Sequence, residues 1–461
     1  MGSGIKFLAC FAAAAAFVSP AIAQSPDTDF FAGTAAVTLS GGTPAAKPLA
    51  SFDISFVDPT IGLYALGDRT NNAVDLVDTH GNTFLGFCGH GKFQGAVPKA
   101  PPATGVNNDV SGPDGVLIRD HREIWVGDGN SSVKVFDVAG CSETSSPTHT
   151  ISTIRGAPGA PLPGHDATTD KRADEMCYDP RDNLIMVANN AADPPYGNLI
   201  STKTYSVVGQ IVFDGTNGAP NSSNGAEQCQ WSSRTGLFYI TIPGITHPAD
   251  DGHGVVAVID PHQKKVVNVF DIPLANCATP QGMAVGPDHD ILVGCNGAGS
   301  TTHSSVIIDE RNGKIRATVA DESGPDEVWF NPGNNHYYLA RSAPASGEQA
   351  LGFIDAETRA ADVSLFVGPP GKSAHSVAAD SVNNKAFYPI PGSIGGVDNR
   401  CSNAGGSDTE GCILVVTGKN DRDDKGDRGK DCVAEGAPVI LASDEDHDAK
   451  FMRGKCDRDR R

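Results

Sequence analysis

The stretch SGPDGVLIRD at 111–120 has a close counterpart in TPQGMAVGPD at 279–288 and a looser one in GPDEVWFNPG at 324–333. Each stretch contains a turn, then Asp or Gln, then a short apolar run and a second turn. Short apolar runs bounded by Gly, Pro and Asp are typical of β-strands joined by tight turns. The recurrence indicates an internal repeat, and the period of a repeat predicts the architecture.

Seven copies of the repeat occur, at intervals of 45 to 61 residues. They are FDISFVDP (52–59), PDGVLIRD (113–120), ADEMCYDP (173–180), EQCQWSS (227–233), PQGMAVGPD (280–288), PDEVWFNP (325–332) and AHSVAADS (374–381). A turn and a second apolar run follow each copy, and most copies have a later run that ends in Asp. Four short strands per unit, at such a period, are typical of a β-propeller blade.

A four-stranded sheet with two apolar faces cannot bury itself alone, whereas blades stacked in a ring bury both faces and protect their edges. We therefore predict an all-β fold, a seven-bladed β-propeller over residues 35–418. The ring must close, and the N-terminal strand AAVTLS (35–40) is well placed to complete the last blade. PVILAS (438–443) is the alternative closing strand.

The two ends of the chain differ from the repeat. Lys6 precedes an apolar run that ends in Ala21-Ile22-Ala23, which predicts a secretory signal peptide at 1–23, cleaved near Ala23. We expect a periplasmic or secreted protein. Residues 419–461 hold 11 basic and 12 acidic residues, a composition that predicts a charged, partly disordered tail pinned by a disulfide.

Cysteine usage fits an oxidising compartment. The chain has 11 cysteines, and ten remain after removal of the signal peptide with Cys10. An even number of cysteines in an exported protein predicts mostly disulfides. The chain has no CxxC pair, so we expect no zinc ribbon. The local pairs that we expect are Cys277–Cys295, Cys401–Cys412 and Cys432–Cys456, while other connectivities stay open.

The formal net charge is −20 at pH 7. An acidic surface argues against nucleic acid and anionic membranes as partners, because their phosphates attract basic patches. Beyond the signal peptide no apolar run approaches 18 residues, so we expect no membrane insertion. We expect a monomer.

One position of the repeat should lie at the mouth of the central channel, where each inner strand begins. This position holds Asp53, Asp114, Asp174, Glu227, Gln281, Asp326 and His375, and Glu175, Gln228 and Glu327 stand directly behind it. Five carboxylates around one opening repel each other, so either their pKa values rise or a cation neutralises them. Each Asp could instead only cap a turn, around a channel filled with water.

The first six residues of that set are the predicted ligands of a divalent cation. Oxygen ligands suit calcium best, with magnesium or manganese possible, and His375 would also admit zinc. Loops between the second and third strands of each blade should lie on the same face, where a rigid scaffold commonly binds ligands. From these loops we expect contacts to a small-molecule or carbohydrate ligand by Asn189, Asn190, His247, His253 and His303.

The repeat resembles the YVTN/NHL class of bacterial propellers over 35–418. The PDG turn at 113–115 and the PQG turn at 280–282 are also similar to the P-N-G and P-D-G turns of the SMP-30/gluconolactonase group. That resemblance implies a cation site that includes Asp114, Gln281 and Asp326, with an Asp as base. The group has six blades rather than seven, and its usual ligand is Asn where this chain has Gln281.

These observations leave several functions open. The first is a metal-dependent hydrolase of lactonase type, acting on a small ester or lactone through Asp114, Asp326 and His375. The alternative is a non-catalytic propeller that binds a small ligand, a carbohydrate or a protein partner through its loops. A polysaccharide lyase is less favoured, because an acidic mouth repels a uronate substrate.

Overall fold

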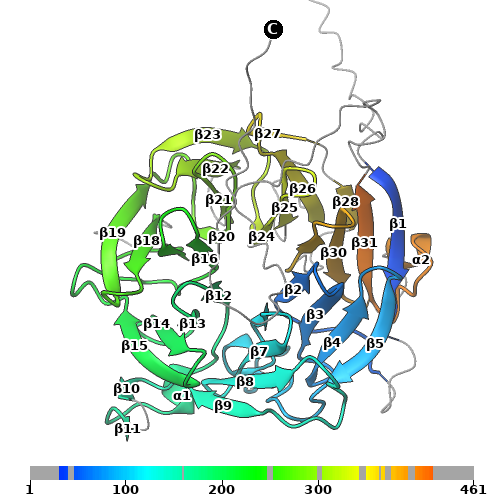
Figure 1. Ribbon diagram of the computed structural model, residues 1–461, viewed down its shortest axis with the longest axis horizontal. Coiled ribbons are helices and arrows are strands. Elements are labelled where there is room, and N and C mark those ends of the chain that lie inside the picture. The colour runs from blue at the N-terminus through cyan, green and yellow to red at the C-terminus, as the bar shows by residue number, and fades with distance from the viewer. Residues whose placement is uncertain are drawn as a thin grey trace, which may run out of the picture.

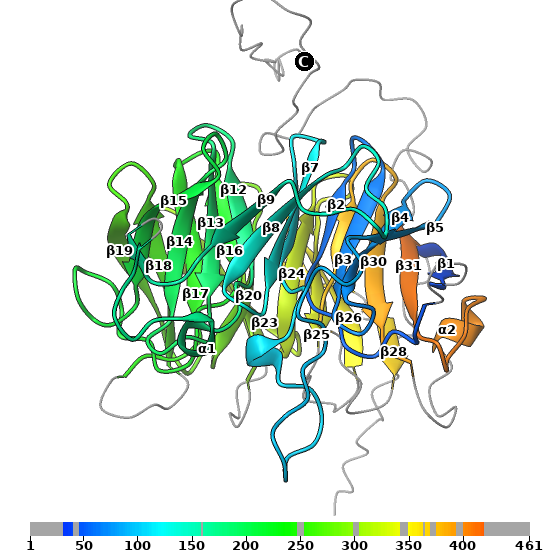
Figure 2. The same ribbon diagram turned by 90° about the horizontal axis from the view of Figure 1, so that it is seen from below.

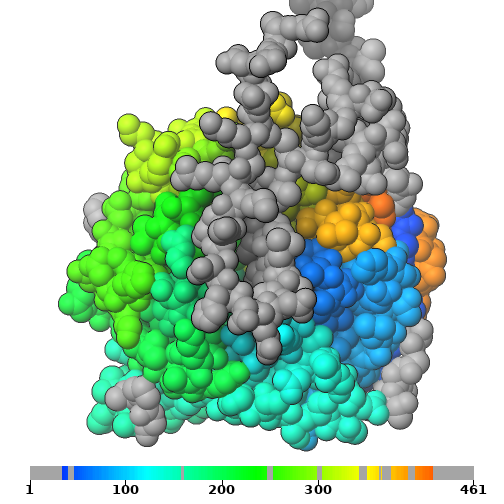
Figure 3. All heavy atoms as spheres, in the orientation of Figure 1, coloured from blue at the N-terminus to red at the C-terminus, as the bar shows by residue number. Residues whose placement is uncertain are grey.

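The computed structural model describes residues 31–39, 46–157, 160–246, 253–297, 304–341, 349–362, 365–368, 375–392 and 400–418. The predicted signal peptide, the charged tail with Cys432 and Cys456, the alternative closing strand, His247 and His303 lie outside these residues. Seven antiparallel sheets stand around a central axis, so the predicted seven-bladed β-propeller is confirmed (Figure 1). In the space-filling view the blades follow one another in chain order, from blue through green to orange (Figure 3).

Each blade is one sheet whose first strand is innermost. Blade 1 is β2 (Ser55–Asp58), β3 (Leu63–Asp68), β4 (Ala73–Asp78) and β5 (Thr83–Cys88). Blade 2 is β6 (Val116–Arg119), β7 (Glu123–Asp128), β8 (Ser132–Asp137) and β9 (His149–Ser152). Blade 3 is β12 (Met176–Asp179), β13 (Leu184–Asn189), β14 (Tyr196–Ser201) and β15 (Ser206–Val212). Blade 4 is β16 (Cys229–Ser232), β17 (Leu237–Ile242), β18 (Gly254–Asp260) and β19 (Lys265–Ile272).

Blade 5 is β20 (Pro280–Val285), β21 (Asp290–Cys295), β22 (Ser304–Asp309) and β23 (Ile315–Ala320). Blade 6 is β24 (Pro325–Asn331), β25 (His336–Arg341) and β26 (Gln349–Asp355), with β27 (Ala360–Ala361) and β28 (Leu365–Gly368) both paired to β26. Blade 7 is β29 (Ala378–Asp380), β30 (Lys385–Ile390), β31 (Cys412–Gly418) and β1 (Phe31–Val37). Short elements between blades are β10 (Gly156–Ala157), β11 (Ala160–Pro161), α1 (Ala167–Asp170), α2 (Arg400–Asn403) and a 3-10 turn at Asn108–Val110.

Apolar residues on both faces of each blade pack against the neighbouring blades. Between blades 3 and 4, for example, Met186 and Leu199 share one buried cluster with Phe238 and Ile240. The strands run between the two flat faces of the ring, as the edge-on view shows (Figure 2). The innermost strands of the seven blades begin around the axis, on one of these faces.

The Asp that ends many strands of the repeat closes a tight turn. The Oδ1 atom of Asp179 accepts hydrogen bonds from the backbone N–H groups of Arg181 (2.8 Å) and Asp182 (3.2 Å). Asp380 does the same for Val382 (2.9 Å) and Asn383 (3.0 Å). These Asp residues satisfy backbone donors that a hairpin turn would otherwise leave unpaired. Their recurrence reflects turn chemistry at the ends of strands.

The N-terminal strand closes the ring, as predicted. β1 lies antiparallel to β31, with Ala36 opposite Leu414 and Val37 opposite Ile413. In Figure 1 this pairing places the blue β1 beside the orange β31. Val37 is only 3% exposed and packs in a cluster that reaches from blade 7 to blade 1. Closure thus places β1, which precedes blade 1 in the chain, in the same sheet as the strands of blade 7.

Four disulfides connect the described cysteines. The predicted pairs Cys277–Cys295 and Cys401–Cys412 are confirmed. Two further disulfides, Cys88–Cys141 and Cys177–Cys229, join residues more than fifty positions apart, which local spacing could not predict. Several disulfides in one chain indicate an oxidising environment. In the described part of the chain, no helix has the length and apolar character needed to cross a membrane.

Closing the ring with β1 predicts a large effect of a buried charge there. Val37→Asp would place a carboxylate in the cluster between blades 7 and 1, and should lower the free energy of unfolding by about 3 kcal/mol. Thr34→Asp is the matched control, because Thr34 lies on the same strand and is exposed. Urea unfolding of both variants measures the difference; equal stability would contradict a closing role for β1.

Candidate functional site

Repeated backbone hydrogen bonds fix the predicted ring position at one level. In blades 1 to 4 its N–H group donates to a carbonyl of the second strand. The pairs are Asp53 to Gly67 (2.9 Å), Asp114 to Gly127 (2.9 Å), Asp174 to Ala188 (2.7 Å) and Glu227 to Thr241 (2.9 Å). Gln281 and Asp326 lie at bulges in β20 and β24, and His375 precedes β29. We call these seven residues the channel ring.

Close approach of neighbouring blades explains the glycine of the PDG and PQG turns. A Cβ atom on Gly115 would lie 2.0 Å from the carbonyl oxygen of Asp174, in the next blade. A Cβ atom on Gly282 would lie 2.8 Å from the carbonyl oxygen of Asp326. Only glycine permits such an approach. The same turns thus bring successive ring residues together.

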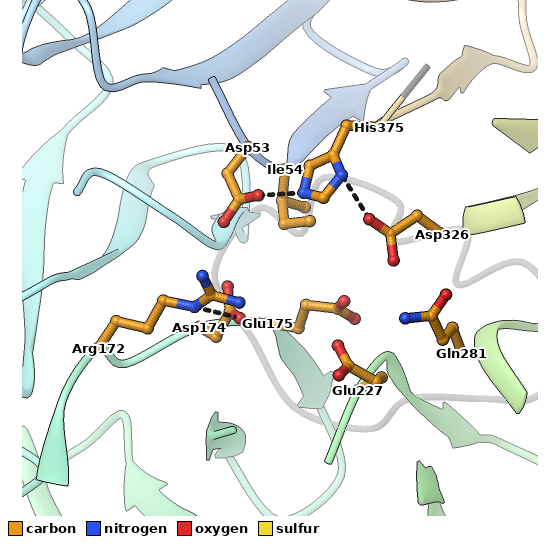
Figure 4. A pocket seen from close by; sticks show the side chains of 9 residues that line it. All are labelled: Asp53, Ile54, Arg172, Asp174, Glu175, Glu227, Gln281, Asp326 and His375. Atoms are coloured by element: carbon orange, nitrogen blue, oxygen red, sulfur yellow. Dashed lines mark hydrogen bonds and ion pairs between the residues drawn. The ribbon is translucent and has the colours of Figure 1, made fainter. Parts of the chain in front are cut away.

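The channel ring surrounds a small polar cavity of about 190 Å³ (Figure 4). Six ring residues line it, together with three residues next to the ring. The lining residues are Asp53, Ile54, Arg172, Asp174, Glu175, Glu227, Gln281, Asp326 and His375. Asp114 is fully buried beside this cavity and does not line it.

Arg69, which follows β3, neutralises one side of the ring. Its Nε atom donates to Asp114 Oδ1 at 2.8 Å, and its Nη2 atom contacts both Asp114 Oδ1 and Asp53 Oδ2. Although burial alone would raise it, the charges of Arg69 and His375 hold the pKa of Asp53 well below its usual range. Burial raises the pKa of Asp114 well above its usual range, despite Arg69.

His375 bridges two carboxylates across the ring. Its Nε2 atom lies 2.5 Å from Asp53 Oδ1, and its Nδ1 atom contacts Asp326 Oδ2 (Figure 4). Burial favours the neutral ring, but Asp326 and Asp53 outweigh it and raise the pKa of His375 well above its usual value. Both ring nitrogens are thus engaged, and the two carboxylates favour the imidazolium form.

Three acidic residues of the ring come close enough to share a metal ion. Carboxylate oxygens of Asp53, Asp114 and Asp174 lie within 4.8 Å of one another. Arg69 already contacts the first two, so a guanidinium group supplies positive charge at that point. Sequence reasoning missed Arg69 and Arg172, because neither occupies the repeated position. The only sequence signal for Arg172 is its place two residues before Asp174 in KRAD (171–174), whereas Arg69, in GDRT (67–70) after β3, has no comparable signal.

Other carboxyl groups of the cavity are matched less completely, and Asp174 contacts Arg172 through Oδ2. Glu175 is 6% exposed and Asp174 is 3% exposed, and no N–H or hydroxyl donor among the described residues reaches Glu175 Oε2 or Asp174 Oδ1. Burial, with the charges of Asp326 and Asp174, raises the pKa of Glu227 to about 8. Burial raises the pKa of Asp174 to about 6, in spite of Arg172.

Polar side chains from three blades meet behind the ring. Burial, together with their mutual interaction, raises the pKa values of Glu175 in blade 3 and Glu327 in blade 6 well above their usual range. Gln228 in blade 4 donates to Glu327 Oε2 at 2.9 Å, and its Oε1 accepts from the N–H groups of Met283 (2.6 Å) and Val328 (3.1 Å). Burial and the repulsion between the two carboxylates therefore favour protonation of this pair.

A second cavity of about 400 Å³ adjoins the first and shares Arg172 and Glu227 with it. Arg172 Nε donates to Asp174 Oδ2 (2.7 Å) and to Asn190 Oδ1 (3.1 Å), so these residues form the wall between the cavities. Polar loop residues line the rest of the cavity. They include Asp109, Asp193, Ser222, Ser223 and Asn224.

The predicted loop ligands take different places. Asn190 lines the second cavity. Asn189 is fully buried, where its Nδ2 atom donates to the carbonyl of Asp170 at 3.0 Å and its Oδ1 atom accepts from Asn198 at 2.9 Å. His253 contacts Asp271 at 2.6 Å and lines neither cavity. The side chain of Gln281 lines the first cavity, and its Oε1 atom accepts a hydrogen bond from Asn296.

The chain matches no protein family, and no curated protein matches it. Solved structures with the same fold include U3-55K, with 10% identity and a TM-score of 0.54 over 85% of this chain and 100% of that one. The WD40 β-propeller domain of Doa1 has 13% identity and a TM-score of 0.51 over 85% of this chain and 99% of that one. Kuenenia stuttgartiensis hydrazine synthase has 13% identity and a TM-score of 0.51 over 74% of this chain and 92% of that one. At such identities these structures support the β-propeller fold alone.

The raised pKa of Glu227 predicts a pH dependence of stability in the absence of metal. The unfolded state ionises near the usual pKa of 4.5, whereas the folded state keeps the proton up to about 8. Between these pH values, ionisation lowers the free energy of the unfolded state. This group therefore makes the protein less stable as pH rises. Glu227→Gln, which cannot ionise, should gain stability relative to the wild type from pH 5 to pH 8.

Urea unfolding in EDTA at both pH values measures that gain. Glu357→Gln is the control, because Glu357 is an exposed carboxyl group away from the ring. A stability difference between wild type and Glu227→Gln that stays constant with pH would contradict the raised pKa.

Proposed function

We propose that this protein is an exported β-propeller whose channel mouth binds a divalent cation, best fitted by calcium, and through it a small oxygen-rich ligand. The observation that carries the proposal is the uneven matching of charge in the cavity. Asp53 and Asp114 contact Arg69, and His375 contacts Asp53 and Asp326. By contrast, Asp174 Oδ1 and Glu175 Oε2 are buried oxygen atoms that no described N–H or hydroxyl group reaches.

The proposed ligands are Asp174, Glu175 and Glu227, which all line the 190 Å³ cavity. Carboxylate oxygens suit a hard cation such as calcium. Zinc is less favoured, because both nitrogens of His375 already contact carboxylates and no thiolate lines the cavity. Without a cation, raised pKa values keep some of these carboxyl groups protonated, and a bound cation would displace the protons.

Calorimetry on the purified full chain, after dialysis against EDTA, tests this proposal. Calcium should bind with one ion per chain, and at pH 7 binding should release about one proton, seen as a dependence of the heat on the buffer's ionisation enthalpy. Glu227→Gln should weaken calcium binding at least about tenfold and reduce proton release. Glu357→Gln should bind calcium as the wild type does. The absence of calcium binding in the wild type would reject the proposal.

A second candidate is a metal-dependent hydrolase acting on a small ester or lactone. Glu227 favours it, since a carboxyl group with a pKa raised to about 8 can hold a proton at neutral pH and pass it to a leaving group. Asp326 is the carboxylate of the predicted catalytic set with access to the cavity. Asp114 is buried against Arg69, and His375 is held between two carboxylates, so we assign both to charge balance in this mechanism.

Turnover of a panel of lactones and aryl esters by calcium-loaded protein tests the hydrolase. Glu227→Gln and Asp326→Asn should each lower kcat at least about a hundredfold, because a positioned general acid or base contributes on that order. Asp137→Asn, at an exposed position, is the control. No turnover, or turnover unaffected by both variants, would leave the non-catalytic binding function.

A further inference from the structure

Arg172 has unpaired donors between the two cavities. Its side chain is 13% exposed, and its Nε atom is committed to Asp174 and Asn190. No described residue accepts a hydrogen bond from either Nη atom, and the residue lines both cavities. In Figure 4 the guanidinium group points toward the centre of the first cavity. One N–H group from each Nη atom can donate to one oxygen of a carboxylate, because the guanidinium group is planar and holds the two donors side by side.

Gln281 offers a second donor on the far side of that cavity. Because its Oε1 atom is occupied by Asn296, its amide nitrogen is the atom left for the cavity, as Figure 4 shows. Donors for an oxygen-bearing ligand therefore lie at two points of an otherwise acidic site. Asp326 would repel an anion that binds alone, and so would Glu175 and Glu227 once they ionise, so its binding requires a cation that offsets their charge.

The second cavity has the size and chemistry for a hydroxylated body. At about 400 Å³ it is the larger of the two, and hydroxyl and amide groups of Asn190, Ser222, Ser223 and Asn224 line it. Pro195 and Ala192 supply apolar surface in the same cavity. Such a mixture suits a sugar ring, which presents hydroxyl groups at its edge and C–H groups on its faces.

We propose that the ligand of the channel mouth is a uronic acid, with its carboxylate bridging the bound cation and the Nη atoms of Arg172 and its sugar ring in the second cavity. The inference rests on the proposed cation site. The cation and Arg172 make the position of the carboxylate locally positive, which offsets the repulsion of a uronate by the acidic channel mouth. Binding of cation and uronate is then coupled, and each strengthens the other by the same factor.

Calorimetric titration of the full chain with D-galacturonate tests this, with D-galactose as the probe that lacks only the charge. Galacturonate should bind when calcium is saturating and should bind at least about tenfold more weakly in EDTA. Galactose should bind at least about tenfold more weakly than galacturonate in calcium. Galacturonate binding of equal strength in EDTA, or equal binding of both sugars, would overturn the inference.

Two substitutions at one residue separate recognition from folding. Arg172→Gln should weaken galacturonate binding at least about tenfold while calcium binding stays as tight or becomes tighter, because a neighbouring positive charge is removed. Arg172→Lys keeps the charge but loses the fork, and should weaken galacturonate in the same direction. Arg122→Gln, on the exposed turn between β6 and β7, is the control.

The results distinguish failure of the cation site from failure of the uronate assignment. If wild-type protein binds no calcium, the proposed cation site itself fails. If calcium binds and galacturonate does not, or if both Arg172 variants bind galacturonate like the wild type, the cation site stands and the uronate assignment is wrong.

Discussion

The structure depends on a single requirement, that each blade must bury two apolar faces. A lone four-stranded sheet cannot do so, and an open stack would leave two faces in water. Packing of blade 7 against blade 1 buries both of these faces, and pairing of β1 with β31 holds the ring closed. Closure then forces the first residues of seven inner strands toward one axis, whatever their charge. The polar site is thus a consequence of how the apolar core is completed.

Bringing so many acids together has an electrostatic cost, which the chain offsets in two ways. On one side, Arg69 and His375 match Asp53, Asp114 and Asp326 with fixed positive charge. On the other, burial raises the pKa values of Glu175 and Glu227, so protons stay bound until something replaces them. The first arrangement is permanent and structural. The second can respond to a ligand, which is why we place function there.

Much of this architecture could be predicted from the sequence, because the repeat encodes local geometry. Turn residues and apolar runs gave the blade count and the closing strand, and equivalent positions gave the ring residues. Arg69 and Arg172 could not be predicted in the same way, since they enter the site from positions that the repeat does not share. The disulfides Cys88–Cys141 and Cys177–Cys229 also depend on blades meeting in space. What escaped prediction lies outside the pattern that the blades share.

The side chains of Glu175, Gln228 and Glu327 affect how solutes can move along the central passage. These side chains are 6%, 7% and 2% exposed, and they come from three blades that meet across the axis. Together they narrow the central passage behind the ring, which hinders movement of a solute along the axis.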